Sequence, residues 1–175
     1  MVTQEYLKLI LDYNPDTGEF IWKQRPKEHF KKIRTCHMWN AKWVGKKAGS
    51  PEASGHMQIA IDGRRYKSHR LAWLYIYGVW PTKLVDHANG ITDDNRIKNL
   101  REASRSQNAA NSKKPRNNTS GFKGVCWDKS SQKWHARITV NKKEIHIGHF
   151  DCAELAHLAY SEYAAKLQKQ FARID

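Results

Sequence analysis

The sequence has few cysteines, and they are poorly spaced for pairing. Cys36, Cys126 and Cys152 lie far apart and form no CxxC pair. They are therefore expected to be reduced, small core residues and not parts of a disulfide framework. His29 and His37 lie close to Cys36, but no second ligand pair follows at finger spacing, which argues against structural zinc.

Long apolar runs are also missing. No segment approaches the roughly 20 apolar residues of a membrane span. The first residues, MVTQEYLKLILDYNPDTG, carry acidic and polar side chains that are untypical of a signal peptide. The sequence therefore predicts a soluble protein that stays inside the cell and has no membrane partner.

Acidic residues are scarce relative to basic ones. The chain has 31 Lys and Arg against 17 Asp and Glu, a formal net charge of +14. Such an excess favours a polyanionic partner, most often nucleic acid. The apolar fraction of 39% is ordinary, and 175 residues suffice for one domain or two small ones.

The first part of the chain alternates between turn signals and short apolar patterns. These predict a helix over 4–11, a turn and strand over 13–22, a hairpin of 56–61 and 64–67 around Asp62-Gly63, and a helix over 69–77 that Ser68 caps and Gly78 ends. Residues 24–50 are basic, aromatic and irregular, and predict no regular element.

The last part predicts a small sheet on one helix. The polar stretch SKKPRNNTS at 112–120 is typical of a linker. Strands are expected at 122–127, 133–140 and 144–149, with a turn at 141–143, and a helix at 152–168 with Asp151 and Glu154 as its capping box. The second strand alternates, with Trp134, Ala136, Ile138 and Val140 on the face toward the helix. The expected helical stripe is Ala156, Ala159, Tyr160, Tyr163, Ala164 and Leu167.

The segment 84–111, LVDHANGITDDNRIKNLREASRSQNAAN, carries the candidate chemistry. Asp86 and His87 are followed by a loop rich in Gly, Asp and Asn, then by Asn99 and Asn108. Hydrolysis of a phosphodiester needs a base for water, a hard cation at the phosphate and a scaffold for both. This spacing suits a nuclease site with one metal ion.

Residues 13–111 resemble the HNH endonucleases of phages and mobile introns. The motifs that carry the resemblance are HRLAW at 69–73, VDH at 85–87, DNR at 94–96, NLR at 99–101 and QN at 107–108. The resemblance implies a ββα-metal unit in which Asp86 is a metal ligand, His87 the general base, Asn99 a brace between loop and strand, and Asn108 the second protein ligand. Asn111, one helical turn further on, is the alternative ligand.

The implied donors are a carboxylate and an amide oxygen, which favour Mg²⁺, or Mn²⁺, over zinc. No small-molecule organic cofactor is expected. Asp93, Asp94 and Asn95 are expected to shape the loop, and His69 to be a satisfied core or capping residue. Arginines 70, 96 and 101 contact phosphate or brace the fold through carboxylates; the sequence leaves both roles open.

Residues 120–172 resemble the DNA-binding domain of plant APETALA2 and ethylene-response factors. The shared motifs are GFKGV at 121–125, WHARI at 134–138 and IGHF at 147–150, with AE at 153–154 leading to AY at 159–160. The resemblance implies that the outer sheet face lies in the major groove. The expected DNA-contacting residues, with three from the linker, are Lys113, Lys114, Arg116, Lys123, Lys129, His135, Arg137, Thr139, Lys142, Lys143 and His146. Cys126, Asp128, Glu144 and His146 depart from the plant pattern, so target specificity does not carry over.

Taken together, these features predict an α+β protein with an HNH nuclease domain at 1–111, a basic linker at 112–120 and an APETALA2-like domain at 121–175. The expected function is a site-directed, homing-type endonuclease on double-stranded DNA, phage-encoded, a monomer or weak dimer, acting in the cytoplasm of the bacterial host. The alternative is a catalytically silent DNA-binding regulator; RNA is a weaker alternative substrate.

Overall fold

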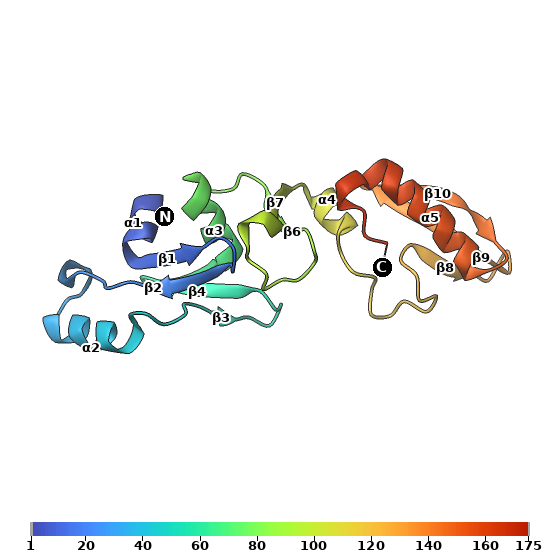
Figure 1. The fold of residues 1–175 in the computed structure, drawn as a ribbon. Coiled ribbons are helices and arrows are strands. Elements are labelled where there is room, and N and C mark those ends of the chain that lie inside the picture. The colour runs from blue at the N-terminus through green and yellow to red at the C-terminus, as the bar shows by residue number, and fades with distance from the viewer. Residues whose placement is uncertain (1, 175) are drawn as a thin grey trace. The chain divides into compact units, whose positions relative to one another are not determined.

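The buried apolar residues gather in separate clusters, and the chain divides with them into two compact units, Met1–Glu102 and Ala103–Asp175. The computed structural model describes residues 2–174, and Figure 1 shows its elements along the chain. Residues 103–111 group with the second unit and not with the first, because Ala103 and Ala110 pack on Phe171 near the C-terminus.

The first unit contains most of the helices and three small sheets. In chain order its elements are α1 (Gln4–Ile10), β1 (Leu11–Asn14), β2 (Glu19–Trp22), the 3-10 helix η1 (Lys27–His29), α2 (Ile33–Trp43), β3 (Ser50–Pro51), β4 (Met57–Ile61), β5 (Arg64–Lys67), α3 (Ser68–Tyr77), β6 (Leu84–His87), the 3-10 helix η2 (Ile97–Asn99) and β7 (Leu100–Ala103). β1 pairs with β2, β4 lies between β3 and β5, and β6 pairs with β7.

One core holds these pieces together. Leu7 and Ile10 of α1, Phe20 of β2, Ile59 of β4 and Leu71 of α3 are all almost completely buried in it. Burying side chains of this size contributes about 1.5 to 3 kcal/mol each. The β1–β2 hairpin and α3 are therefore held in place by the same hydrophobic core.

The second unit is a three-stranded antiparallel sheet covered by a helix. Its elements are α4 (Arg105–Ala110), β8 (Val125–Asp128), β9 (Lys133–Val140), β10 (Lys143–Phe150), α5 (Ala153–Gln168) and the 3-10 helix η3 (Lys169–Phe171). β9 is the central strand, and α5 lies along one face of the sheet (Figure 1). Ala136 and Ile138 of β9 pack against Ala156, Tyr160 and Ala164 of α5. The predicted α+β class and the sheet on one helix are confirmed.

Several local expectations were wrong. Residues 33–43 form a helix, α2, although Cys36 is its one buried residue. It is held instead by polar contacts, since the Asn40 side chain accepts from Arg25 N at 3.0 Å and donates to Arg25 O at 2.9 Å. Trp39 adds an edge-on contact with Trp22, at 5.1 Å between ring centroids.

The expected helix caps also differ. Ser68 is the first residue of α3 and Lys67 the N-cap, while Cys152 is the N-cap of α5; neither helix has a side-chain cap hydrogen bond. The capping box lies on α4, where Ser104 and Gln107 exchange both bonds. The outer members of the α5 stripe, Tyr163 and Leu167, are exposed, because one sheet covers only a narrow strip of the helix.

A β-bulge changes which residues of β10 face outward. The register with β9 shifts between His146 and Gly148, so that His146 pairs with Arg137 and His149 with His135. The extra residue returns His149 to the face that His146 occupies. Among the described residues, no helix is both long enough and apolar enough to cross a bilayer.

Gly124 gives a test of the packing in the second unit. Its φ is +74°, and a Cβ there would overlap the Tyr160 ring. We predict that Gly124→Ala lowers the free energy of unfolding of this unit by about 2 to 4 kcal/mol, because the left-handed backbone and the overlap both oppose it. Gly121 has φ +79° with nothing within 4 Å of its Cβ position. Gly121→Ala is therefore the matched control, and it is expected to lower the free energy of unfolding by only about 1 kcal/mol. Equal losses, measured by hydrogen exchange in α5, would contradict this packing.

Candidate functional site

Asp86 and His87 end strand β6, and both are buried, at 6% and 5% exposure. The Asp86 carboxylate accepts from Arg101 Nε on β7 at 2.9 Å. This ion pair offsets the unfavourable burial of the Asp86 charge. Arg101 thus braces the fold through a carboxylate, one of the two roles that the sequence left open.

The His87 ring is oriented by Asn95. Asn95 Nδ2 donates to the Asp93 carbonyl at 3.1 Å, which turns Asn95 Oδ1 toward His87 Nε2 at 3.3 Å. An amide oxygen only accepts, so neutral His87 carries its proton on Nε2 and its lone pair on Nδ1. Burial lowers the pKa of His87, which keeps the ring neutral and basic near neutral pH.

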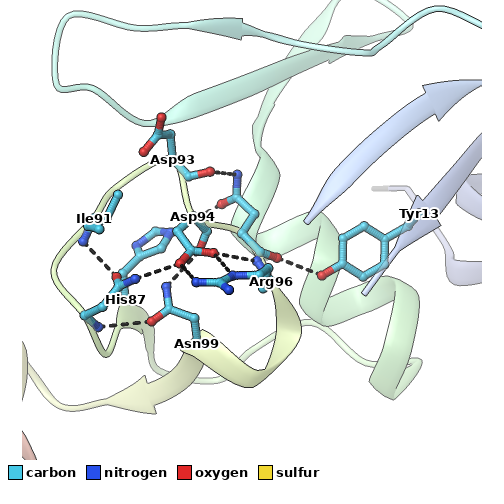
Figure 2. Close-up of polar contacts among 9 residues, drawn as sticks. Tyr13, His87, Ile91, Asp93, Asp94, Arg96 and Asn99 are labelled. Carbon is cyan, nitrogen blue, oxygen red and sulfur yellow. Dashed lines mark hydrogen bonds and ion pairs between the residues drawn. The ribbon is translucent and has the colours of Figure 1, made fainter. Parts of the chain in front are cut away.

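The loop between β6 and β7 closes on Asn99. Asn99 Oδ1 accepts from Asn89 N at 3.0 Å, and Asn99 Nδ2 donates to Asp94 O at 2.8 Å. The Asn99 carbonyl also accepts from Ala88 N at 2.8 Å. The Asp94 carboxylate in turn accepts from Asn89 Nδ2 and pairs with Arg96, which lowers the pKa of Asp94 to about 2. Figure 2 shows His87, Asp94, Arg96 and Asn99 within this network.

The β1–β2 hairpin supports the loop from outside. Tyr13 Oη donates to Asn95 O at 2.7 Å, and Figure 2 shows the Tyr13 ring reaching toward the loop. Ile97 N donates to Pro15 O at 3.1 Å. Gly18, at φ +76°, lies so close to the Asn95–Arg96 peptide that a Cβ would overlap it. These contacts connect the loop to the core of the first unit.

Three histidines gather beside the loop; His56 was missed from the sequence, and His69 was expected only as a core or capping residue. His56 precedes β4 and His69 lies in the first turn of α3; their rings lie 5.7 and 5.0 Å from that of His87, centroid to centroid. His69 is buried, but its Nδ1 has no hydrogen-bond partner among residues 2–174. The expectation of a satisfied His69 was therefore wrong. Burial, and then the neighbouring His87 and His56, lower the pKa of His69 to about 3.

The outer face of the second unit's sheet carries a different histidine cluster. His146 Nδ1 and His135 Nε2 are 2.7 Å apart, and the His149 ring stacks on His135 at 5.0 Å between centroids. Burial, and then His146 and His149, lower the pKa of His135. The alternation of β10 alone would have placed Gly148 outward, so His149 was missed; a glycine inside a strand is a known sign of a bulge.

Acidic residues lie among the basic ones on this face. Arg137 pairs with Glu144 at 3.0 Å, and His149 Nε2 lies 3.0 Å from the Asp128 carboxylate. Ser130, through its hydroxyl and backbone, lowers the pKa of Asp128 further below its usual range. The remaining candidates on or beside the sheet are exposed: Lys129, Thr139, Lys142 and Lys143.

Two of the candidate lysines also make contacts inside the unit. Lys123 Nζ donates to the carbonyls of Ala110 and Ser112, the second at 2.7 Å, and so satisfies carbonyls at the end of α4. Lys114 Nζ donates to Gly121 O at 2.7 Å. Lys113 and Arg116 of the same segment are exposed.

Comparison with known proteins agrees with both halves of this description. The model of the HNH endonuclease family matches residues 66–110, and that of the AP2 domain matches residues 120–170. Protein 3.8 of Escherichia phage T7 is 34% identical over 89 residues, which make up 51% of this chain and 73% of that protein. The chain belongs to the HNH endonuclease family. It also carries an AP2 domain, and both domains imply DNA binding. No solved structure matches the chain.

The HNH match contains every residue that sequence reasoning assigned to the active site. Asp86, His87 and Asn99 lie in the first unit, on β6 and at the end of η2. His87 and Asn99 take part in the loop network, and Asp86 pairs with Arg101. Asn108 and Asn111 belong to α4 and its C-cap in the second unit. Asn108 is exposed, whereas Asn111 is buried at 7% exposure.

The depressed pKa of His69 makes the stability of the HNH domain depend on pH. Folded His69 stays neutral down to about pH 3, while the unfolded residue, with the ordinary histidine pKa of 6.5, binds a proton below that pH. The stabilisation is thus complete above pH 6.5 and is lost as the pH falls from there. We predict that, between about pH 6.5 and about pH 5, wild type loses about 1 kcal/mol per pH unit more than His69→Gln. Urea unfolding read by hydrogen exchange in α3 measures this, and identical slopes would contradict it.

Proposed function

We propose that the protein is a metal-dependent, site-directed endonuclease that hydrolyses phosphodiester bonds of double-stranded DNA. The observation that carries the proposal is the orientation of His87. Asn95 contacts its Nε2, which leaves the basic lone pair on Nδ1. His87 directly follows the buried Asp86 in the sequence. A base with a fixed tautomer and a lowered pKa suits the removal of a proton from water at neutral pH.

Each residue of the loop has a role in this proposal. His87 Nδ1 takes the proton of the attacking water, while Asn95 keeps the ring from turning. Asn99 joins the two ends of the loop and so holds Asn95 at the distance that His87 requires. Arg101 balances the charge of Asp86. A general base positioned in this way contributes about 10² to 10⁴ in rate.

The donor chemistry fits a hard divalent cation. In this proposal Asp86 would supply a carboxylate oxygen, and the resemblance to HNH enzymes implies an amide oxygen from Asn108, with Asn111 as the alternative. Oxygen donors of this kind favour Mg²⁺, with Mn²⁺ as the alternative. When bound, the ion supplies stabilisation of negative charge at the phosphate and the departing 3′ oxygen.

The AP2 domain is the part that directs the protein to a site on DNA. Its outer sheet face offers His135, Arg137 and His146, and the turn beside it offers Lys142 and Lys143. The exposed residues of the 112–120 segment add charge for phosphate contacts. Glu144 and Asp128 offset part of this charge, so the face is less basic than the residue count alone implies.

The similarity to a phage protein supports action in the cytoplasm of a bacterial host. One proposed site per chain in a monomer or weak dimer gives a nick, or two cuts in sequence. The resemblance to HNH enzymes implies products with a 5′-phosphate and a 3′-hydroxyl.

Nicking of supercoiled plasmid that contains the source genome's target region tests the function. We predict Mg²⁺-dependent nicking by wild type and a rate about 10² to 10⁴ times lower for His87→Ala, because water then lacks its base. His37→Ala, at an exposed position of α2, is the matched control and keeps the wild-type rate. A wild type that binds this DNA but never nicks it with Mg²⁺ or Mn²⁺ indicates the silent regulator instead.

A further inference from the structure

The three histidines of the HNH domain are close enough to share one ion. One ring nitrogen from each of His56, His69 and His87 lies within 4.8 Å of the others. Nitrogens bound tetrahedrally to one zinc ion are about 3.3 Å apart, from bond lengths of about 2.0 to 2.1 Å. The three nitrogens therefore have to approach one another by about 1.5 Å at most to bind one ion.

His69 supplies an independent sign of a ligand. The residue is only 7% exposed, and within residues 2–174 its Nδ1 meets no hydrogen-bond partner. A buried polar atom without a partner is unfavourable unless something else binds it. His69 also has a neutral ring at neutral pH, which is the form that offers a lone pair to a metal ion.

Polar groups on one ring nitrogen orient the His56 ring, as is common for metal-binding histidines. Its Nδ1 lies 2.9 Å from Ser54 Oγ and 3.7 Å from the Glu52 carboxylate. A hydroxyl or carboxylate on one ring nitrogen holds the ring so that the other nitrogen serves as the ligand. Asn95 holds His87 in the same manner, through Nε2.

The donor set selects the kind of ion. Three imidazoles suit Zn²⁺ and similar transition metals, with a fourth position left for water. Mg²⁺ prefers oxygen donors and near-octahedral geometry, so it belongs with Asp86 and not with this cluster. Neutral His87 has a single lone pair, on Nδ1, which serves either a metal ion or a proton from water.

We propose that His56, His69 and His87 form a second metal site, specific for Zn²⁺-like transition metal ions, and that its occupation switches the nuclease off by taking the lone pair of His87. The inhibitory half of this inference rests on the proposed function, whereas the binding half does not.

Isothermal titration of Zn²⁺ into the metal-stripped protein of residues 1–175 tests the binding half. Wild type takes up one equivalent at this site, and both His56→Gln and His69→Gln weaken that binding at least about tenfold, since each removes one of three ligands. His146→Gln, which alters the histidine cluster on the sheet, is the matched control and keeps the affinity. Circular dichroism without metal checks that each variant is folded. Because His56 is only half-buried, His56→Gln is the less disruptive change, and its zinc affinity tests the site if His69→Gln unfolds.

Absence of zinc binding by wild type, or unchanged binding by His56→Gln, overturns the site. Loss of binding in His146→Gln alone assigns the zinc to the sheet and overturns it as well.

Plasmid nicking tests the inhibitory half. With Mg²⁺ in large excess, one equivalent of Zn²⁺ stops wild type, whereas His56→Gln continues to nick because His56 takes no part in the proposed hydrolysis. Equal inhibition of the two proteins contradicts the switch. A protein that nicks under no condition overturns the proposed function and the switch together, while calorimetry still decides the zinc site separately.

Discussion

The hydrogen bonds of one buried amide, Asn99, determine the shape of the site. They join Asn89 near the start of the β6–β7 loop to Asp94 near its end, and an amide is suited to this because it donates and accepts at once. A loop of this length has polar backbone that needs partners wherever it is buried. With both ends fixed on Asn99, Asn95 is placed beside His87, and the tautomer of His87 follows.

Other elements of the first unit contact the β6–β7 loop and His87 from two sides. The β1–β2 hairpin contacts the loop through Tyr13 and through Gly18, whose missing Cβ permits the approach. On the other side His56 and His69 face the His87 ring. The same rigid imidazole is therefore proposed both as a base for hydrolysis and as a ligand for an inhibitory ion, and the two uses exclude each other.

The sequence predicted the parts of the fold that follow from short-range patterns. Such patterns predicted the hairpin at Asp62-Gly63, the helix that ends at Gly78 and the alternation of β9. Helix α2 was not predicted, because Asn40 and Trp39 hold it through contacts with Arg25 and Trp22, which only tertiary packing brings close. Asp86, His87 and Asn99 could be named as candidates because they lie close together in sequence, in the order of the HNH motifs. His56 and His69 were missed as a cluster because only tertiary packing brings them to His87, and His149 because a bulge shifts its register.

The central claim is that Asn99 holds the loop so that His87 acts as a base, and the most direct measurement is the Mg²⁺-dependent nicking rate of Asn99→Asp. Aspartate has the same shape but cannot donate to Asp94 O, so the loop loses its second connection. The account predicts a rate at least about ten times below wild type in a protein whose circular dichroism and DNA affinity are unchanged. A folded Asn99→Asp variant that nicks at the wild-type rate would contradict it.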